Sequence, residues 1–177
     1  MNRKTRRRSG TGALEEKLAT TLASLPIPEP WDRGRFIEGV AELRGRPITV
    51  IPAGRLELPE LGESPCGLWL LREHDDIIVH EDATSEYHMD QIVCHEIGHM
   101  VLGHGQAEPP ADGELGDPRY AAVLPDLDPS TVRGVLGRSH YGDDLEREAE
   151  TFASMLLVAA VSRRQGGDVR RLFFGQR

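Results

Sequence analysis

Cysteine is scarce in this sequence, and its scarcity excludes two common frameworks for small proteins. Among 177 residues only Cys66 and Cys94 occur. Two cysteines are too few for a disulfide scaffold and match poorly with a zinc site built from thiolates. Disulfide-free proteins are typical of reducing compartments, so we expect a cytoplasmic protein in which Cys94 serves in packing.

Long apolar runs are also lacking. No segment approaches the ~18 apolar residues of a membrane-spanning helix. No apolar stretch follows the basic N-terminus, as one would in a signal peptide. Hydrophobic residues make up 38% of the chain and charged residues 28%, which is typical of a globular protein. We therefore expect a single domain over residues 13–165 and no membrane partner.

Acidic residues are absent from the first twelve positions. Those positions hold five basic residues: Arg3, Lys4, Arg6, Arg7 and Arg8. The rest of the chain has 16 basic and 29 acidic residues, a net charge of −13. Such a body repels nucleic acid, so we expect no direct nucleic-acid binding by the folded part. Residues 1–12 are predicted to form a disordered basic tail, with contact to nucleic acid or a membrane as the alternative, and residues 166–177 a second basic tail.

Two helices are predicted before the sequence pattern changes. Leucines at helical spacing predict the first over residues 13–25. The second is predicted from an Asp32 cap to Leu43, closed by Gly45.

Three β-rich runs follow, over residues 47–51, 67–71 and 77–80. A short polar loop separates the last two runs, which predicts an antiparallel pair lying beside the first strand. The fold class expected is α+β, with a small three-stranded, mostly antiparallel sheet packed on helices.

The run His95-Glu96-Ile97-Gly98-His99 is the most informative motif. Apolar residues at three- and four-residue spacing surround it, which predicts an amphipathic helix capped by Thr84 or Ser85 and ended by Gly103. Residues four apart lie on one face of a helix. His95 and His99 are therefore predicted to hold one metal ion, with Glu96 beside a water on that ion.

A catalytic zinc site usually has three protein ligands, so a third is needed. A histidine six residues after His99 would give the metzincin pattern, but Gly105 stands there. His104 and His140 remain as alternative third ligands, although the position of His104 just after Gly103 is more typical of a helix-end residue. The histidines without a pairing pattern, read as ordinary polar residues, are His74, His80 and His88.

The last predicted helix offers a better third ligand. It starts at Asp143 or Asp144, runs to about Arg163 and carries an apolar stripe. On a helical wheel Glu146 lies inside that stripe, where an acid is costly unless it is paired or binds a metal. Glu146 is thus the predicted ligand, with Glu148 on the flank as the alternative and Glu150 as a hydrogen-bond acceptor for a ligating histidine. The competing interpretation is that these acids only stabilise the helix N-terminus.

Between the two helices lie segments with weaker signals. Residues 106–127 are rich in Pro, Gly and Asp and are predicted to form a long surface loop. Asp128-Pro129 ahead of Val132 and Val135 then predicts a short helix.

The segments HEIGHMVLGH and LEREAETFASMLL together resemble the ImmA/IrrE family of metallopeptidases. These are gluzincins, with the pattern H-E-x-x-H followed by E-x-E-A-[ND]-x-F-A-x-x-L-L-x-P. The resemblance covers roughly residues 35 to 160. It implies a zincin-like fold with His95, His99 and Glu146 as zinc ligands and Glu96 as general base. The sequence departs from the pattern at Glu150, and after Leu156-Leu157, where the usual proline is missing.

The resemblance also implies a function. It indicates a zinc-dependent endopeptidase of regulatory type that cleaves a partner protein, such as a helix-turn-helix repressor or an antitoxin, in a stress response or in transcription regulation. Tyr141 or His140, just before the last helix, is expected to stabilise the oxyanion. The alternative is a non-proteolytic regulator that binds its partner through the same fold. A structural zinc domain is disfavoured because a fourth Cys or His ligand is missing.

Overall fold

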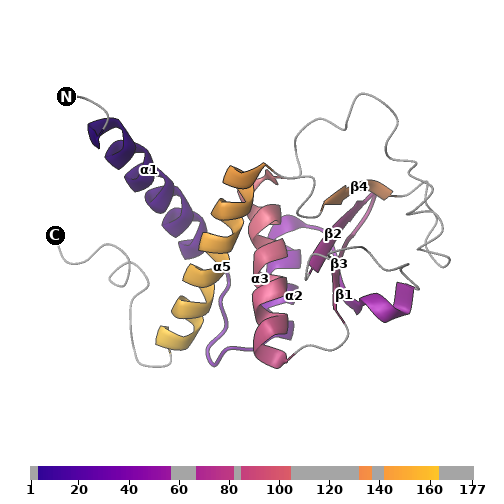
Figure 1. Ribbon diagram of the computed structural model, residues 1–177. Helices are drawn as coiled ribbons and strands as arrows, with labels where there is room; N and C mark the ends of the chain where they lie inside the picture. The colour runs from indigo at the N-terminus through magenta and orange to yellow at the C-terminus, as the bar shows by residue number, and fades with distance from the viewer. Residues whose placement is uncertain (1–3, 57–66, 82–84, 105–131, 137–141, 164–177) are drawn as a thin grey trace.

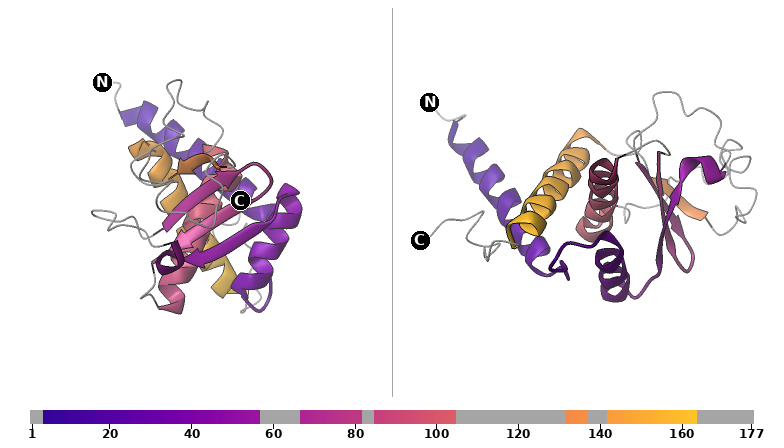
Figure 2. Two further views of the ribbon diagram at one scale, coloured as in Figure 1. Left: turned by 90° about the vertical axis from the view of Figure 1, so that its right-hand side faces the viewer. Right: turned by 90° about the horizontal axis from the view of Figure 1, so that it is seen from below.

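Helices stack in successive layers beside a mixed β-sheet in the computed structural model, which describes residues 4–56, 67–81, 85–104, 132–136 and 142–163 (Figure 1). Seen from below, α1, α5, α3 and the sheet follow one another across the molecule (Figure 2). The α+β class predicted from the sequence is therefore confirmed. Within the described ranges, no helix is long and apolar enough to span a membrane.

Helix α1 (Lys4–Ala23) is the outermost layer. Its leucines Leu18 and Leu22 are fully buried in the core. The helix begins well before the predicted start at Ala13, so helical backbone runs through most of the segment predicted as a disordered tail. Lysine and arginine are good helix formers, and no proline interrupts the chain before Pro26.

Helix α2 (Arg33–Arg44) has both predicted caps. The Asp32 side chain accepts a hydrogen bond from the Arg35 backbone N–H at 2.9 Å, which satisfies one of the donors left over in the first turn. Gly45 ends the helix with φ of 66°, a left-handed conformation that favours glycine.

The three predicted strands are all present, as β1 (Ile48–Pro52), β2 (Gly67–Arg72) and β3 (Asp76–His80). A 3₁₀ helix, η1 (Ala53–Leu56), follows β1. β2 and β3 form the predicted antiparallel hairpin, and β1 lies beside β3 in parallel. The middle strand β3 is buried at every position.

A fourth strand, β4 (Val132–Leu136), corrects the prediction of a short helix after Asp128-Pro129. It pairs antiparallel with β2 and gives the strand order β1-β3-β2-β4. The cap-and-proline signal is local, whereas β-branched residues such as Val132 and Val135 favour a strand when a partner is available. The backbone groups along β2 supply that partner.

The two helices that carry the motif residues are α3 (Glu86–Leu102) and α5 (Asp143–Arg163). Ser85 caps α3 by accepting from the His88 N–H, and Gly103 ends it with φ of 79°. α3 packs on the sheet with one face and on α5 with another, and the start of α5 lies at the end of α3 (Figure 1). The predicted loop over 106–127 and the tail over 166–177 lie outside the described residues.

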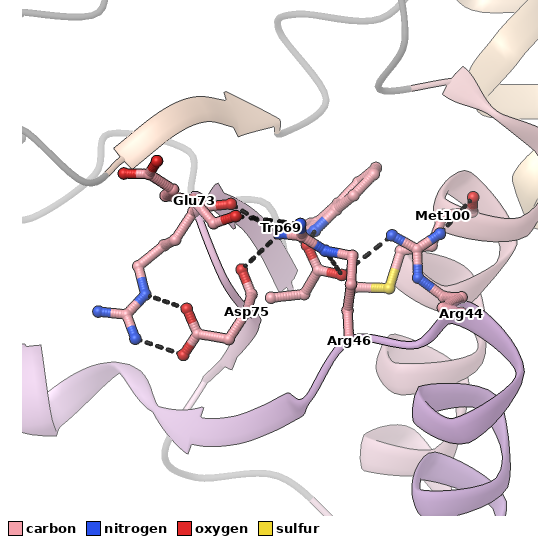
Figure 3. Close-up of polar contacts among 8 residues, drawn as sticks. Arg44, Arg46, Trp69, Glu73, Asp75 and Met100 are labelled. Atoms are coloured by element: carbon pink, nitrogen blue, oxygen red, sulfur yellow. Dashed lines mark hydrogen bonds and ion pairs between the residues drawn. The ribbon is translucent and has the colours of Figure 1, made fainter.

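A network of polar contacts around a buried aspartate links the sheet to α2 and, through Arg44, to α3; Figure 3 shows Arg44, Arg46, Trp69 and Met100 of this network. Asp76, fully buried at the start of β3, accepts from Arg44 Nη2 at 2.9 Å and from Trp69 Nε1 at 3.1 Å. Arg44 in turn donates through Nη1 to the Met100 carbonyl at 3.0 Å, near the end of α3. Arg46 also reaches Asp76, through Nε at 3.4 Å. The position of α3 over the sheet is thus fixed by charge as well as by packing.

Replacing this aspartate should destabilise the fold far more than replacing its neighbour. Asp76→Ala leaves the Trp69 donor and two guanidinium groups without their shared acceptor, and we expect it to lower the free energy of unfolding by about 3 kcal/mol. Asp75→Ala removes only a partly exposed pair with Arg72 and should cost less than about 1 kcal/mol. Urea denaturation measures both values. Equal losses in the two variants would contradict the role given to Asp76.

Candidate metal centre

Three side chains from two helices converge at the contact between α3 and α5. His95 and His99 come from α3 and Glu146 from the first turns of α5, and one ligand atom of each lies within 4.8 Å of the others. The two imidazole Nε2 atoms are 3.0 Å apart. Glu146 Oε2 lies 3.5 Å from His95 Nε2, and Glu146 Oε1 lies 3.4 Å from His99 Nε2. The residues predicted as metal ligands therefore form one group.

The spacing of these atoms fits a tetrahedral metal ion. Zinc with ligands at about 2.1 Å places neighbouring ligand atoms about 3.4 Å apart. The two imidazole nitrogens, 3.0 Å apart, are close to this value, and each lies 3.4–3.5 Å from one of the two Glu146 oxygens, His95 from Oε2 and His99 from Oε1. Two imidazoles and one carboxylate are also a donor set that zinc takes in catalytic sites. The group is thus a candidate metal centre.

A glycine at the helix contact allows Glu146 to reach the histidines. Gly98 lies inside the motif on the face of α3 that meets α5. A Cβ built there would lie 3.2 Å from Phe152 Cδ1 and 3.4 Å from the Ala149 carbonyl oxygen. Ala149 and Phe152 are themselves fully buried. Small residues on both sides therefore bring the two helix backbones close together, one turn from Glu146.

Burial keeps His99 in the state that binds metal. Its ring is fully buried, and burial, helped by the neighbouring rings of His95 and His104, lowers the pKa of His99 to about 3. The imidazole is thus neutral at pH 7, and a lone pair is available without loss of a proton.

Glu148, the alternative third ligand, faces a different set of partners. Its Oε2 atom lies 2.9 Å from Lys17 Nζ and 3.4 Å from His104 Nε2. Burial alone would raise the pKa of the Glu148 carboxyl, but Lys17 and His104 outweigh it and leave that pKa below the usual value. The carboxylate is ionised and directed along α5 toward α1, and it is not a member of the metal group.

Sequence reasoning missed the role of His104. It lies just after Gly103, is buried, and places Nδ1 3.0 Å from His99 Nδ1. The supporting contact to a ligating histidine that the sequence assigned to Glu150, which is exposed on α5, stays a prediction. Burial is also the main cause of a lowered pKa for the His104 imidazole, despite the opposing pull of Glu148. The available signal was Gly103, four residues after His99, because its left-handed backbone folds the chain back toward the helix end.

The other histidines lie apart from the metal group wherever the structure describes them. His74 is exposed, and His88 pairs with Glu81 at 3.0 Å. His80 is buried with Nδ1 2.8 Å from the Glu81 carbonyl oxygen. His140 and Tyr141, the residues expected to stabilise an oxyanion, lie outside the described residues.

Glu96, the predicted general base, is buried on α3 beside the first residue of β2. A Cβ built on Gly67 would come within 2.8 Å of Glu96 Oε1 and 2.6 Å of Ile92 Cγ2. The carboxylate therefore occupies space that any larger residue at the start of β2 would fill. Cys94, next to the ligand His95, is fully buried, and burial raises the pKa of its thiol, so it serves in packing.

Comparison with known proteins found no family model, no curated protein and no solved structure that matches this chain. The resemblance to the ImmA/IrrE family therefore stays a prediction from the motif residues.

Removing the carboxylate of Glu146 should abolish tight metal binding. Glu146→Ala deletes one of three ligands, and we expect zinc affinity to fall by more than about 100-fold, beyond what loss of a supporting contact costs. Competition with a chromophoric chelator measures the affinity. Asp144→Ala, which removes an exposed acid of the same helix that pairs with Arg147, is the matched control and should bind zinc as wild type does. If Glu146→Ala binds zinc with wild-type affinity, Glu146 is not a ligand.

Widening the contact at Gly98 should disturb the same centre from a distance. Gly98→Val forces α5 away from α3, and we expect a loss of about 1–3 kcal/mol in stability together with weaker zinc binding. Gly12→Val in α1 is the control, because a Cβ there meets nothing within 4 Å. Thermal unfolding and chelator competition give the two values. Unchanged zinc affinity in Gly98→Val would show that close helix packing is not required.

Proposed function

We propose that this protein is a zinc-dependent endopeptidase of the gluzincin type, similar to the ImmA/IrrE family. The observation that carries the proposal is the convergence of His95, His99 and Glu146 from two helices. The first two belong to an H-E-x-x-H motif whose glutamate, Glu96, is buried on the same helix. A later helix contributes the third donor, which is the feature that distinguishes gluzincins from metzincins.

The number of protein donors supports a catalytic site over a structural one. Structural zinc is usually closed by four Cys or His side chains, whereas catalytic zinc keeps one position open. The group here has three members among the residues that the structure describes, and one of them is a carboxylate. Such a group leaves room for water or substrate at the metal.

His95, His99 and Glu146 would hold the ion, and zinc so held supplies a Lewis acid that acidifies water and polarises a peptide carbonyl. Glu96 then acts as general base: its carboxylate accepts a proton from the water that attacks the carbonyl carbon. The same carboxylate delivers that proton to the amine nitrogen as the C–N bond breaks. The proton taken from water thus ends on the leaving amine, and Glu96 returns to its ionised form.

The surroundings of Glu96 suit this role. Its side chain is buried, and its carboxylate lies beside Gly67 at the start of β2, as does the Ile92 side chain. A base held in one rotamer pays little entropy to align with the water. A larger residue at position 67 would collide with Glu96 Oε1, so the glycine there leaves room for the carboxylate.

The substrate we propose is a partner protein, such as a helix-turn-helix repressor or an antitoxin. Outside its first twelve residues the chain carries a net charge of −13, which favours a basic partner such as a DNA-binding protein. Regulatory proteolysis of such a repressor would link the enzyme to a stress response or to transcription regulation.

Glu96→Gln should separate metal binding from catalysis. The amide cannot accept the proton from water, so we expect kcat/KM for repressor cleavage to fall by about 10²–10⁴-fold while zinc affinity stays within a few-fold of wild type. The assay incubates the zinc-loaded protein with the helix-turn-helix repressor encoded beside its gene and identifies products by mass spectrometry.

Each outcome of this assay is informative. One specific cut by wild type and none by Glu96→Gln supports the proposal. Cleavage by Glu96→Gln at the wild-type rate would contradict the general-base assignment. Binding of the repressor without a cut by wild type would favour a non-proteolytic regulator.

A further inference from the structure

A chain of polar contacts leads away from the metal group on the side opposite the ligand atoms. His99 turns Nε2 toward His95 and Glu146, while its Nδ1 lies 3.0 Å from His104 Nδ1. The two rings meet edge to face, with centroids 5.0 Å apart and planes at 72°. The short distance between the two Nδ1 atoms shows that one nitrogen of each ring lies at this contact.

The same chain continues to the surface. His104 Nε2 lies 3.4 Å from Glu148 Oε2, and Lys17 Nζ donates to that oxygen at 2.9 Å. The His104 side chain is 3% exposed, that of Glu148 21% and that of Lys17 50%. Three separate elements therefore contribute: the turn after α3, the start of α5 and the middle of α1.

Proton placement along this chain follows from the metal group. The nitrogen that binds a metal must carry a lone pair, so binding through Nε2 leaves the proton of His99 on Nδ1. That N–H can donate to His104 Nδ1 only if His104 carries its own proton on Nε2. The Nε2–H of His104 then faces Glu148, an acceptor that Lys17 keeps ionised. Each ring thus has one tautomer in which its N–H faces an acceptor: His104 Nδ1 for His99, and Glu148 Oε2 at 3.4 Å for His104.

We propose that His104 is a positioning residue that fixes the tautomer and the ring orientation of His99 for metal binding, with Glu148 fixing His104 in turn. The proposal rests on the metal centre of the proposed function and not on peptidase activity. Gly103 makes the arrangement possible, because its left-handed backbone turns the chain back so that His104 lies beside the last turn of α3.

The competing role for His104 is packing at the helix end. The two roles predict different effects for two substitutions of His104. Phenylalanine keeps a ring of similar size but cannot accept a hydrogen bond. Asparagine places an amide oxygen near the former Nδ1 and can accept from His99, although it fills less space.

The test compares zinc dissociation constants of wild type, His104→Phe and His104→Asn by competition with a chromophoric chelator. Loss of a hydrogen bond behind a ligating histidine typically weakens metal affinity 10–100-fold, and we expect that loss in His104→Phe. His104→Asn should recover most of it, to within about threefold of wild type. His88→Asn is the control, because His88 lies at the start of α3, where it pairs with Glu81, and its zinc dissociation constant should equal that of wild type.

Nitrogen-15 NMR of the imidazole rings supplies a second readout that packing would not affect. In metal-free and zinc-loaded wild type we expect His99 as the Nδ1–H tautomer and His104 as the Nε2–H tautomer. In metal-free His104→Phe, the His99 signals should shift toward a mixture of tautomers. This measurement on wild type tests the proposal even if a variant fails to fold.

Two results would overturn the proposal: equal zinc affinity in all variants, or equal loss in His104→Phe and His104→Asn with unchanged His99 tautomers. Neither result depends on cleavage of a protein. If zinc binding follows the prediction but no substrate is cut, the peptidase proposal fails and the role of His104 stands. If a substrate is cut but substitution of His104 leaves zinc affinity unchanged, the peptidase proposal stands and the role of His104 fails.

Discussion

The close approach of α3 and α5 is the constraint on which the metal centre depends. Two histidines one helical turn apart supply only two donors, and the third must come from another element. Gly98 on α3 and Ala149 on α5 let the backbones come close enough for Glu146 to reach both rings. A single larger residue at this contact would separate the donors by more than metal coordination tolerates. The glycine inside the motif is therefore as much a part of the site as the histidines.

The rest of the fold holds α3 in place for this contact. On the sheet side, Asp76 and Arg44 join β3 to α2 and to the end of α3. At the other end, Arg33 and Trp31 bind Asp90 on the first turns of α3. The motif helix is thus anchored at both ends by partly buried polar contacts, while its middle packs against α5. Such rigidity suits a site whose donors must keep their separations.

Local signals account for what the sequence predicts well. The caps at Asp32, Ser85 and the two left-handed glycines depend on neighbours in the chain, and the ends of α2 and α3 follow from them. Glu146 could be identified because an acid in an apolar stripe needs a partner, although the sequence alone left Glu148 open. β4 was missed because strand pairing is non-local, and His104 because its role needs Glu148 and Lys17, which lie far apart in sequence. Features that depend on tertiary contacts could not be predicted from the spacing of residues in the sequence.

The most direct test of this account is the position of the metal ion. Crystals of the zinc-loaded protein, measured on both sides of the zinc absorption edge, locate the ion by its anomalous signal. We predict one peak per chain, at about 2.0–2.2 Å from His95 Nε2, His99 Nε2 and a Glu146 oxygen. A peak held by other residues, or none between these three at saturating zinc, would contradict the metal centre described here.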